Sequence, residues 1–405
     1  MPARQSLALG IWISVGGRYE NDAYKGIAHY LEHLIFKGSK KYSCRKIKES
    51  IEGVGGALNG FTSEELTCYL VKMPSTYSGL ALNILSDMVI NPSIPAEEVQ
   101  KERTVILEEI KMYKDQPQSH VHELLDELLW PKQALGTPII GYVQSVNKIT
   151  RNDIASFRHK FYTPANMVIS AAGSFKQEQL VKSVKRIFSP LKKSPKNVFL
   201  PVQEGQTIPQ LEVLHKDTEQ THLALGFHGF KRDHPLRHAL GIMHVILGAN
   251  MSSRLFEELR EKRGLAYEIG TQVKRFHDTG AFIVHAGIDN RKVPQTLNLI
   301  FRELKKIKNK LVTDGEFRRA KEFYLGQLML ALEDSLDHML WIGETTATLD
   351  KAYSLGEIVK EIRRVEKDDI RQAAKQIFKG NNLNLALIGP LQENRDKIYK
   401  ELRIE

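Results

Sequence analysis

The feature of the 405-residue sequence that most constrains its fold is a repeated tetrapeptide. Leu-Ala-Leu-Gly occurs at residues 7–10 and again at 223–226, and each copy leads into an apolar segment that carries a histidine, IAHYLEHLIFKG or GIMHVILGAN. Further along, SIPAEEVQKERTVILEEI in the first half corresponds to LVTDGEFRRAKEFYLGQL in the second at nearly the same offset. Self-similarity of this kind indicates two copies of one structural unit.

The segment between the two copies has the composition of a linker. SPLKKSPKNVFLPVQEGQ is rich in proline, lysine and polar residues, as connections between domains commonly are. We therefore expect a first domain over residues 1–190, a linker over residues 191–206 and a homologous second domain over residues 207–405.

Composition sets the general class of protein. An apolar content of 42% allows a large core divided among two or three domains. The net charge is +10, but lysine and arginine are spread along the whole chain, so nucleic-acid binding is not expected. Two cysteines, Cys44 and Cys68, are too few for a disulfide framework or an all-cysteine zinc site. No apolar run has the length that a membrane span needs, so we expect a cytoplasmic protein without a membrane partner.

The start of the chain could be mistaken for a secretory signal. However, Leu7, Leu9, Ile11 and Ile13 alternate with smaller or more polar residues. This period of two predicts a half-buried strand instead of a signal sequence.

The segment His-Tyr-Leu-Glu-His at residues 29–33 is a candidate metal site. On a helix, His29 and His33 lie one turn apart on one face with Glu32 beside them, and the apolar residues lie opposite. Two neutral imidazoles at this spacing can bind one zinc ion, and the order of residues is that of the inverted zinc-peptidase motif. The alternative is a chance grouping of polar residues on a solvated helix face.

A second predicted helix offers further ligands. From Pro95 to Lys111, the helical period places Glu98, Glu102 and Glu109 along one stripe. Glu102 and Glu109 are two turns apart, so one carboxylate could bind a metal while the other orients its histidines; an exposed charged face is the alternative. Glu32, His33, Glu102 and Glu109 all lack a counterpart in the second copy, which favours one active site per chain. The corresponding residues there are Leu247, Gly248, Ala320 and Gln327.

Over nearly its whole length the sequence resembles the pitrilysin or insulinase-like family of zinc peptidases, in particular its short bacterial members that are similar to the mitochondrial processing peptidase. HYLEHLIFKG matches the family's zinc helix, GGALNGFTSEELTCYLVK its edge strand and hairpin, and KERTVILEEIKMYKDQP its third-ligand helix. The resemblance implies one Zn²⁺ per chain held by His29, His33 and Glu109. It also implies that Glu32 is the general base and that Glu102 is a supporting carboxylate behind the ligands.

The resemblance extends to a substrate-binding pair in the second half. RLFEELREKRGLAYEI is similar to the family segment in which an arginine and a tyrosine seven residues later reach the substrate, here Arg260 and Tyr267. Tyr267 could donate a hydrogen bond to a developing oxyanion, and Arg260 could hold a substrate carbonyl. The alternative, without the resemblance, is that Arg260 is one of several charged residues on an amphipathic helix and that Tyr267 is a half-buried packing residue. The first domain is thus expected to be catalytic, and the second to bind substrate without a metal site.

Residues Gly55–Phe61 are expected to form an exposed edge strand. An extended peptide could add to such an edge by backbone hydrogen bonds, with Asn59 fixing one carbonyl and Phe61 also contacting the substrate. The alternative is that the glycines form a turn or a bulge. The family usually has alanine after this asparagine, so we expect Gly60 to loosen the strand. Family members also begin with a strand upstream of Leu7, so either the first sheet lacks an edge strand or the chain begins further upstream.

Together these features predict an α+β protein of two homologous halves, each a mostly antiparallel sheet covered by helices, enclosing a cavity for peptides. The expected activity is that of a zinc-dependent endopeptidase acting on peptides or unfolded protein segments, with Glu32 activating the attacking water. The resemblance implies a homodimer or a heterodimer with a related chain. The alternatives are a non-catalytic scaffold or peptide-holding subunit of a processing-peptidase-like complex, and a zinc lyase of the S-ribosylhomocysteinase type.

Overall fold

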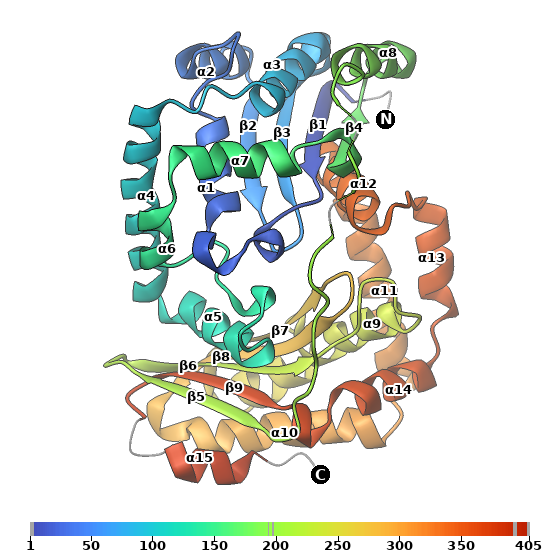
Figure 1. Cartoon of the computed structure of the whole chain (residues 1–405). Helices are drawn as coiled ribbons and strands as arrows, with labels where there is room; N and C mark the ends of the chain where they lie inside the picture. Colours follow the sequence, from blue (N-terminus) through green and yellow to red (C-terminus); the bar gives the residue numbers. More distant parts are fainter. Residues whose placement is uncertain (1–3, 193, 197, 392–394, 403–405) are drawn as a thin grey trace. The chain divides into compact units, whose positions relative to one another are not determined.

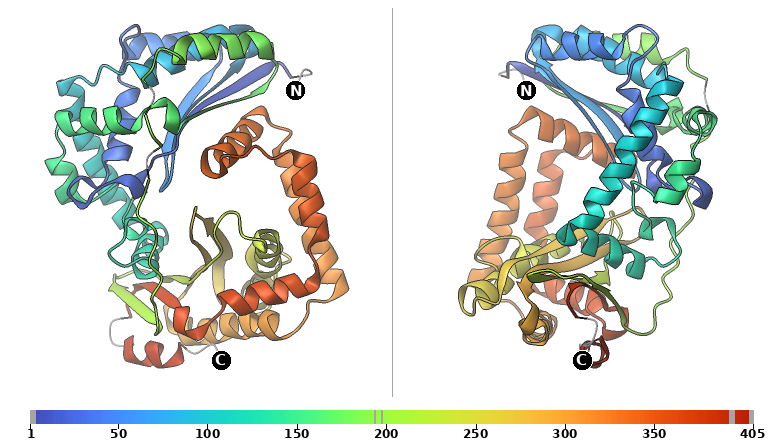
Figure 2. Two further views of the ribbon diagram at one scale, coloured as in Figure 1. Left: turned by 45° about the vertical axis from the view of Figure 1, so that its right-hand side comes forward. Right: turned by 90° about the vertical axis from the view of Figure 1, so that its left-hand side faces the viewer.

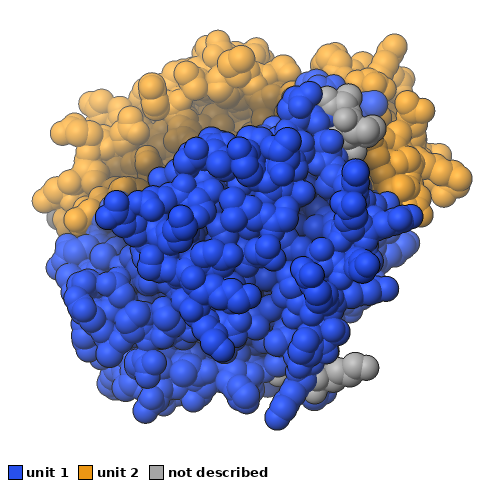
Figure 3. All heavy atoms as spheres, turned by 90° about the horizontal axis from the view of Figure 1, so that it is seen from above, with its two compact units in different colours: residues 1–112, 137–200, 329–353 blue, residues 113–136, 201–328, 354–405 orange. Residues whose placement is uncertain are grey.

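The chain forms two compact units, and each combines several segments of the sequence (Figure 3). The computed structural model describes residues 4–192, 194–196, 198–391 and 395–402. Unit 1 consists of residues 1–112, 137–200 and 329–353, and unit 2 of residues 113–136, 201–328 and 354–405.

Unit 1 is built on a four-stranded antiparallel sheet in the order β2-β3-β1-β4 (Figure 1). Its strands are β1 (Ser6–Ile13), β2 (Ala57–Thr62), β3 (Thr67–Pro74) and β4 (Met167–Gly173). Its helices are α1 (Ile27–Ile35), α2 (Cys44–Glu52), α3 (Ser78–Ile90), most of α4 (Ala96–Asp115), α6 (Val143–Lys148), α7 (Arg151–Phe161), α8 (Gln177–Phe188) and α12 (Ser335–Leu349).

The central strand β1 is buried on both faces. Leu7, Leu9 and Ile11 belong to the main core of unit 1, while Ala8 and Trp12 lie on the other face against α12. The prediction of a half-buried strand was therefore wrong. Its alternation is real, but the second face is covered by a helix that comes from the second half of the sequence (Figure 2).

Unit 2 contains a five-stranded sheet in the order β5-β9-β6-β8-β7, in which only the β5–β9 pair is parallel. Its strands are β5 (Gln210–His215), β6 (Gln220–His228), β7 (Ala266–Arg275), β8 (Gly280–Asp289) and β9 (Asn384–Gly389). Its helices are α5 (Pro117–Leu129), α9 (Arg237–Gly248), α10 (Val293–Asn309), most of α11 (Asp314–Ala331), α13 (Leu355–Arg364), α14 (Lys367–Ile377) and α15 (Arg395–Glu401).

The two halves of the sequence exchange one helix each. Helix α5, from the first half, packs on β6 and β9 of unit 2, and α12, from the second half, packs on β1 and β4 of unit 1. The chain passes from unit 1 to unit 2 within α4, between residues 112 and 113. It passes from unit 2 to unit 1 within α11, between residues 328 and 329. The compact units are thus not contiguous in sequence, which the division into residues 1–190 and 207–405 did not anticipate.

The two sheets differ at one edge. By strand order, β4 of unit 1 corresponds to β9 of unit 2, but no described residues of unit 1 form a counterpart of β5. The described part of the first sheet therefore leaves one edge of β4 unpaired. None of the helices in the described ranges is long and apolar enough to cross a bilayer.

Candidate metal centre

Helix α1 is held firmly at its start. Glu20 accepts hydrogen bonds from the backbone N–H groups of Gly26, at 2.8 Å, and Ala28, at 2.7 Å, so a buried carboxylate satisfies donors that a helix N-terminus leaves free. Gly26 has φ +93°, and a Cβ there would lie 2.5 Å from the carbonyl oxygen of Ile140. Only glycine fits this position.

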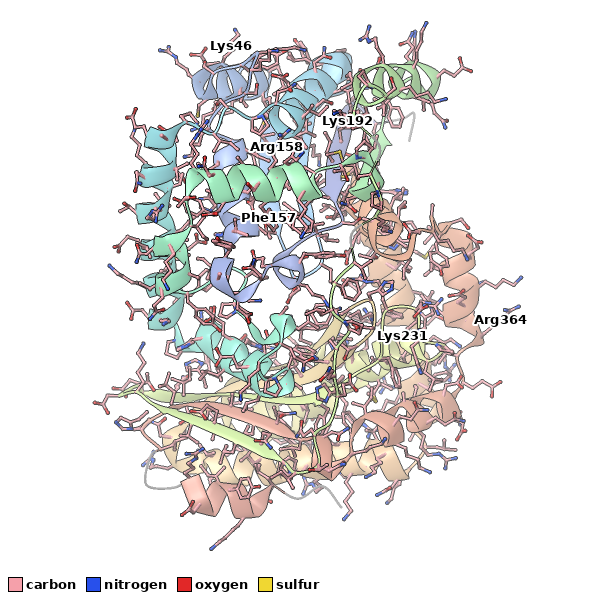
Figure 4. All side chains as sticks on the ribbon, viewed as in Figure 1. Lys46, Phe157, Arg158, Lys192, Lys231 and Arg364 are labelled. Carbon is pink, nitrogen blue, oxygen red and sulfur yellow. The ribbon has the colours of Figure 1, made fainter. Side chains whose placement is uncertain are left out.

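Helices α4 and α7 fix α1 from the side. Phe157 of α7 belongs to the same core as the apolar face of α1, and the neighbouring Arg158 donates to the carbonyl of Ile90 (Figure 4). The hydroxyl of Tyr30 donates to the carbonyl of Val99 on α4. This packing sets the rotation of α1 and α4, so the polar stripes of the two helices meet.

The meeting point brings His29, His33 and Glu109 together. One possible ligand atom from each lies within 4.8 Å of the others, and no other group of three such residues occurs among those that the structure describes. Oε2 of Glu109 is 3.9 Å from Nε2 of His29 and 3.7 Å from Nε2 of His33. Zinc ligands at about 2.1 Å from a shared ion lie up to about 4 Å apart, and the two distances from Glu109 are within this limit.

The charges of the group also fit a metal ion. Burial, together with the neighbouring His33, lowers the pKa of His29 to about 3, so His29 is neutral at pH 7 and its imidazole can act as a ligand. Burial raises the pKa of Glu109, although His33 opposes this shift. A half-buried carboxylate beside two imidazoles is a favourable site for a divalent cation, which would supply positive charge.

Glu32 lies next to His33 and is directed by the end of strand β2. The residue is 9% exposed, and Oε2 of its carboxylate accepts a hydrogen bond of 2.7 Å from the hydroxyl of Thr62. Burial raises the pKa of Glu32, while the Thr62 hydrogen bond and His33 work against this rise. A carboxylate with a raised pKa is suited to take and return a proton near neutral pH.

Glu102 stands behind His33 and not among the ligand atoms. Its Oε2 is 2.9 Å from Nδ1 of His33, and its Oε1 is 2.5 Å from Nζ of Lys37. Burial acts to raise the pKa of Glu102, but the hydrogen bonds from Lys37 and His33 outweigh it and the pKa is lowered. Because an ionised carboxylate can only accept, Nδ1 of His33 carries the proton and Nε2 is free to bind a metal.

Comparison with known proteins places the chain in a family. Residues 1–142 match the family model described as insulinase (peptidase family M16), and residues 148–324 match that of the peptidase M16 inactive domain. An uncharacterized zinc protease of Streptomyces coelicolor is 36% identical over 98% of this chain and 87% of its own length. One from Bacillus subtilis is 35% identical over 96% and 94%. The chain belongs to the M16 (insulinase) family.

Solved structures show the same M16-like fold. A protease from Helicobacter pylori matches with a TM-score of 0.89 and 23% identity over 96% of this chain and 95% of its own. A chain in complex III2 from Candida albicans matches with a TM-score of 0.82 and 18% identity over 99% and 95%. The predicted family and α+β fold are therefore confirmed. The fold occurs in a protease and in a chain of complex III2, so function has to be argued from the residues of the site.

The predicted edge strand of this M16 protein forms β2. Among the described residues it pairs only with β3, and it begins at Ala57, because Gly55, at φ +76°, belongs to the preceding turn. Asn59 is exposed and its Oδ1 accepts from the backbone N–H of Gly60 at 2.8 Å. Phe61 is 37% exposed and contacts Trp12 edge to face, with 5.8 Å between ring centroids.

Arg260 and Tyr267 lie together in unit 2, each at an irregularity of the backbone. Arg260 is on a π-helix, Phe256–Glu261. Tyr267 is the extra residue of a bulge in β7 between Ala266 and Glu268, which explains why its side chain is 75% exposed instead of half-buried. The guanidinium of Arg260 is 5.6 Å from the centre of the Tyr267 ring. π-Helices and bulges are frequent at functional sites.

Sequence reasoning missed two residues of the centre, Thr62 and Lys37. Both lie in segments that carry the family resemblance, TSEELTCY and HLIFKG. Helical and strand periods place residues within one element, but they do not show which side chains of two elements meet.

Proposed function

We propose that this chain is a zinc-dependent endopeptidase that hydrolyses peptides or unfolded protein segments. The observation that carries the proposal is the grouping of His29, His33 and Glu109 within 4.8 Å, with Glu32 beside His33 on the same helix. These three residues would hold one Zn²⁺ ion, whose chemistry is to polarise a peptide carbonyl.

The protein's own groups supply the proton transfers. Because Thr62 holds Oε2 of Glu32, the other carboxylate oxygen is available to take a proton from the attacking water. After the carbon–nitrogen bond breaks, Glu32 gives this proton to the leaving amine. Glu102 keeps the Nδ1–H tautomer of His33 throughout the cycle.

The substrate is proposed to bind as an added strand on β2. A peptide extended along this edge would gain backbone hydrogen bonds, with Asn59 and Phe61 exposed for side-chain contacts. Arg260 and Tyr267 are assigned to the substrate as well, which the family resemblance and the exposure of Tyr267 support. In this proposal residues 1–190 are the catalytic domain, and residues 207–405 bind substrate without a metal. A homodimer, or a heterodimer with a related chain, stays a prediction.

The test is hydrolysis of a mixed set of unstructured peptides, followed by mass spectrometry. We expect cleavage by the wild-type chain and a loss of about 10²- to 10⁴-fold in Glu32→Gln, with about one zinc bound per chain in both. Glu108→Gln is the matched control, because Glu108 precedes a proposed ligand but its side chain is 64% exposed.

Two other outcomes are informative. A wild-type chain that binds no zinc would overturn the proposal. Zinc binding without cleavage would instead favour the alternative, a subunit that holds peptides or serves as a scaffold.

A further inference from the structure

We infer that Lys37 is a positioning residue of the metal centre, which holds Glu102 in place so that Glu102 can orient His33 toward the metal. The inference rests on the proposed function. It adds a residue that the His-x-x-Glu-His motif and the third-ligand helix do not include.

The geometry is a chain of two contacts through one carboxylate. Nζ of Lys37 is 2.5 Å from Oε1 of Glu102, and Oε2 of Glu102 is 2.9 Å from Nδ1 of His33. Each oxygen therefore has its own partner, on opposite sides of the carboxylate. A rotation of the Glu102 side chain would break both contacts, so the ammonium restrains the group that restrains the histidine.

Because Glu102 is buried, the positive charge of Lys37 matters to it. The side chain of Glu102 is 8% exposed and that of Lys37 is 26% exposed. Among the residues that the structure describes, Lys37 and His33 are the basic partners within ion-pair distance of Glu102. A buried carboxylate is costly without a positive partner. Lys37 supplies an ammonium group to the oxygen of Glu102 that does not face His33.

The backbone places Lys37 for this contact. Helix α1 ends at Ile35 with Phe36 as its C-cap, and the backbone N–H of Lys37 donates to the carbonyl of Leu34 at 3.0 Å. Lys37 is therefore held in the turn that directly follows α1, four residues after His33. Gly38, at φ +126°, then turns the chain away.

The consequence concerns the availability of Nε2 of His33. With Glu102 fixed as an acceptor, the proton stays on Nδ1 and the lone pair of Nε2 is free for a metal. Without Lys37 the carboxylate can turn away from His33. Loss of such a supporting partner typically weakens metal binding by about 10- to 100-fold.

The primary test is the zinc affinity of the full chain, measured by competition with a chelator and without any substrate. We expect Lys37→Met to weaken zinc binding by about 10- to 100-fold and Lys37→Arg, which keeps the cation, to retain most of the affinity. Lys40→Met is the matched control, because Lys40 is an exposed lysine three residues along the same segment. The unfolding midpoint of each metal-free variant checks that the fold is intact.

A double-mutant cycle tests whether Lys37 acts through Glu102. In a Glu102→Gln background, adding Lys37→Met should change zinc affinity little, since the group that Lys37 restrains has been replaced. Losses that multiply in the double variant would overturn the inference, as would a Lys37→Met chain that binds zinc like the wild type. If the wild-type chain itself binds no zinc, the proposed function fails and this inference with it.

Discussion

Two corresponding helices, α1 in unit 1 and α9 in unit 2, differ in the residues that form the candidate metal centre. Helix α1 has His29 and His33 on one face. At the matching positions α9 keeps His244 but has Gly248. His244 is neutral, because burial lowers its pKa to about 4, and its Nδ1 lies 2.7 Å from Oγ1 of Thr271 on strand β7.

The difference lies in packing as well as in ligands. A Cβ on Gly248 would lie 2.7 Å from Cγ2 of Thr271 and 2.8 Å from its backbone nitrogen. Strand β7 therefore occupies the space that a second histidine of α9 would need. In the matching register of unit 1, Leu58 of β2 stands where Thr271 stands in β7, and there α1 carries His33. At this position the second half therefore has neither a second histidine nor the room for one.

The largest expected effect comes from the matched pair His29→Ala and His244→Ala. Removing His29 takes away one of three proposed ligands. Loss of a supporting residue weakens metal binding by up to about 100-fold, so loss of a ligand should weaken it further. Peptide hydrolysis should fall with it. His244→Ala should leave both unchanged. Zinc content by metal analysis and hydrolysis of the peptide mixture measure the two effects. Equal losses in the two variants would show that the halves do not differ as the comparison states.

A second pair of variants compares the edge-strand threonines. Thr62 donates to Glu32 at 2.7 Å, and Thr271 contacts His244 at the same distance. Thr62→Val leaves one oxygen of a buried carboxylate unpaired, and the loss of a hydrogen bond to a charged group is worth about 1.5–3 kcal/mol. We expect kcat to fall by about 10- to 100-fold with zinc content unchanged, and Thr62→Ser to restore it. A similar fall in Thr271→Val would contradict the assignment of Thr62 to the base.

A third variant tests the packing in unit 2. Gly248→Ala should destabilise the chain by about 1–3 kcal/mol, because the nearest atoms include the backbone of Thr271, which cannot rotate away. Gly326→Ala is the control: Gly326 is also helical, but a Cβ there meets nothing within 4 Å, so alanine should stabilise by about 0.5–1 kcal/mol. Urea unfolding measures both. A neutral Gly248→Ala would mean that β7 does not exclude the second histidine.

The sequence predicts those parts of the centre that follow from the geometry of single elements. The spacing of His29 and His33, and that of Glu102 and Glu109, follows from the helical period, and the structure brings both pairs to one place. Which glutamate faces the ligand group followed only from the family resemblance, because two turns of a helix put both residues on the same stripe. The structure separates them by their contacts: Glu109 lies near Nε2 of both histidines, and Glu102 contacts Nδ1 of His33.

The parts that the sequence did not predict depend on contacts between distant segments. Trp12 is buried because Gly343 of α12 approaches its ring, and no local pattern around residue 12 indicates a helix that begins more than 300 residues later. Lys37 and Thr62 are likewise explained by partners on other elements. Periodicity reports that a face is apolar or polar, but the residue that covers this face is chosen by tertiary packing.

The smallest expected effect concerns Gly60, which the family resemblance suggested would loosen strand β2. A Cβ at residue 60 would lie 2.8 Å from Cζ of Phe36, so the ring of Phe36 already fills the space of an alanine methyl group. The matching residue of β7 is Val273, so this feature also distinguishes the two halves. The closest contact is with the far end of a side chain, and the backbone oxygen of Cys68 would lie at 3.2 Å, so Gly60→Ala should cost about 1 kcal/mol.

The Phe36→Leu background separates this contact from strand propensity. With the ring shortened, Gly60→Ala should become neutral or stabilising, since alanine loses less conformational entropy than glycine when a strand forms. Urea unfolding of the four chains gives the coupling between residues 36 and 60 directly. If Gly60→Ala has the same effect in both backgrounds, Phe36 is not the reason for the glycine. A positive coupling would show instead that the phenylalanine after the zinc-helix motif and the glycine of the edge strand form one packed pair, which sets the spacing between α1 and β2.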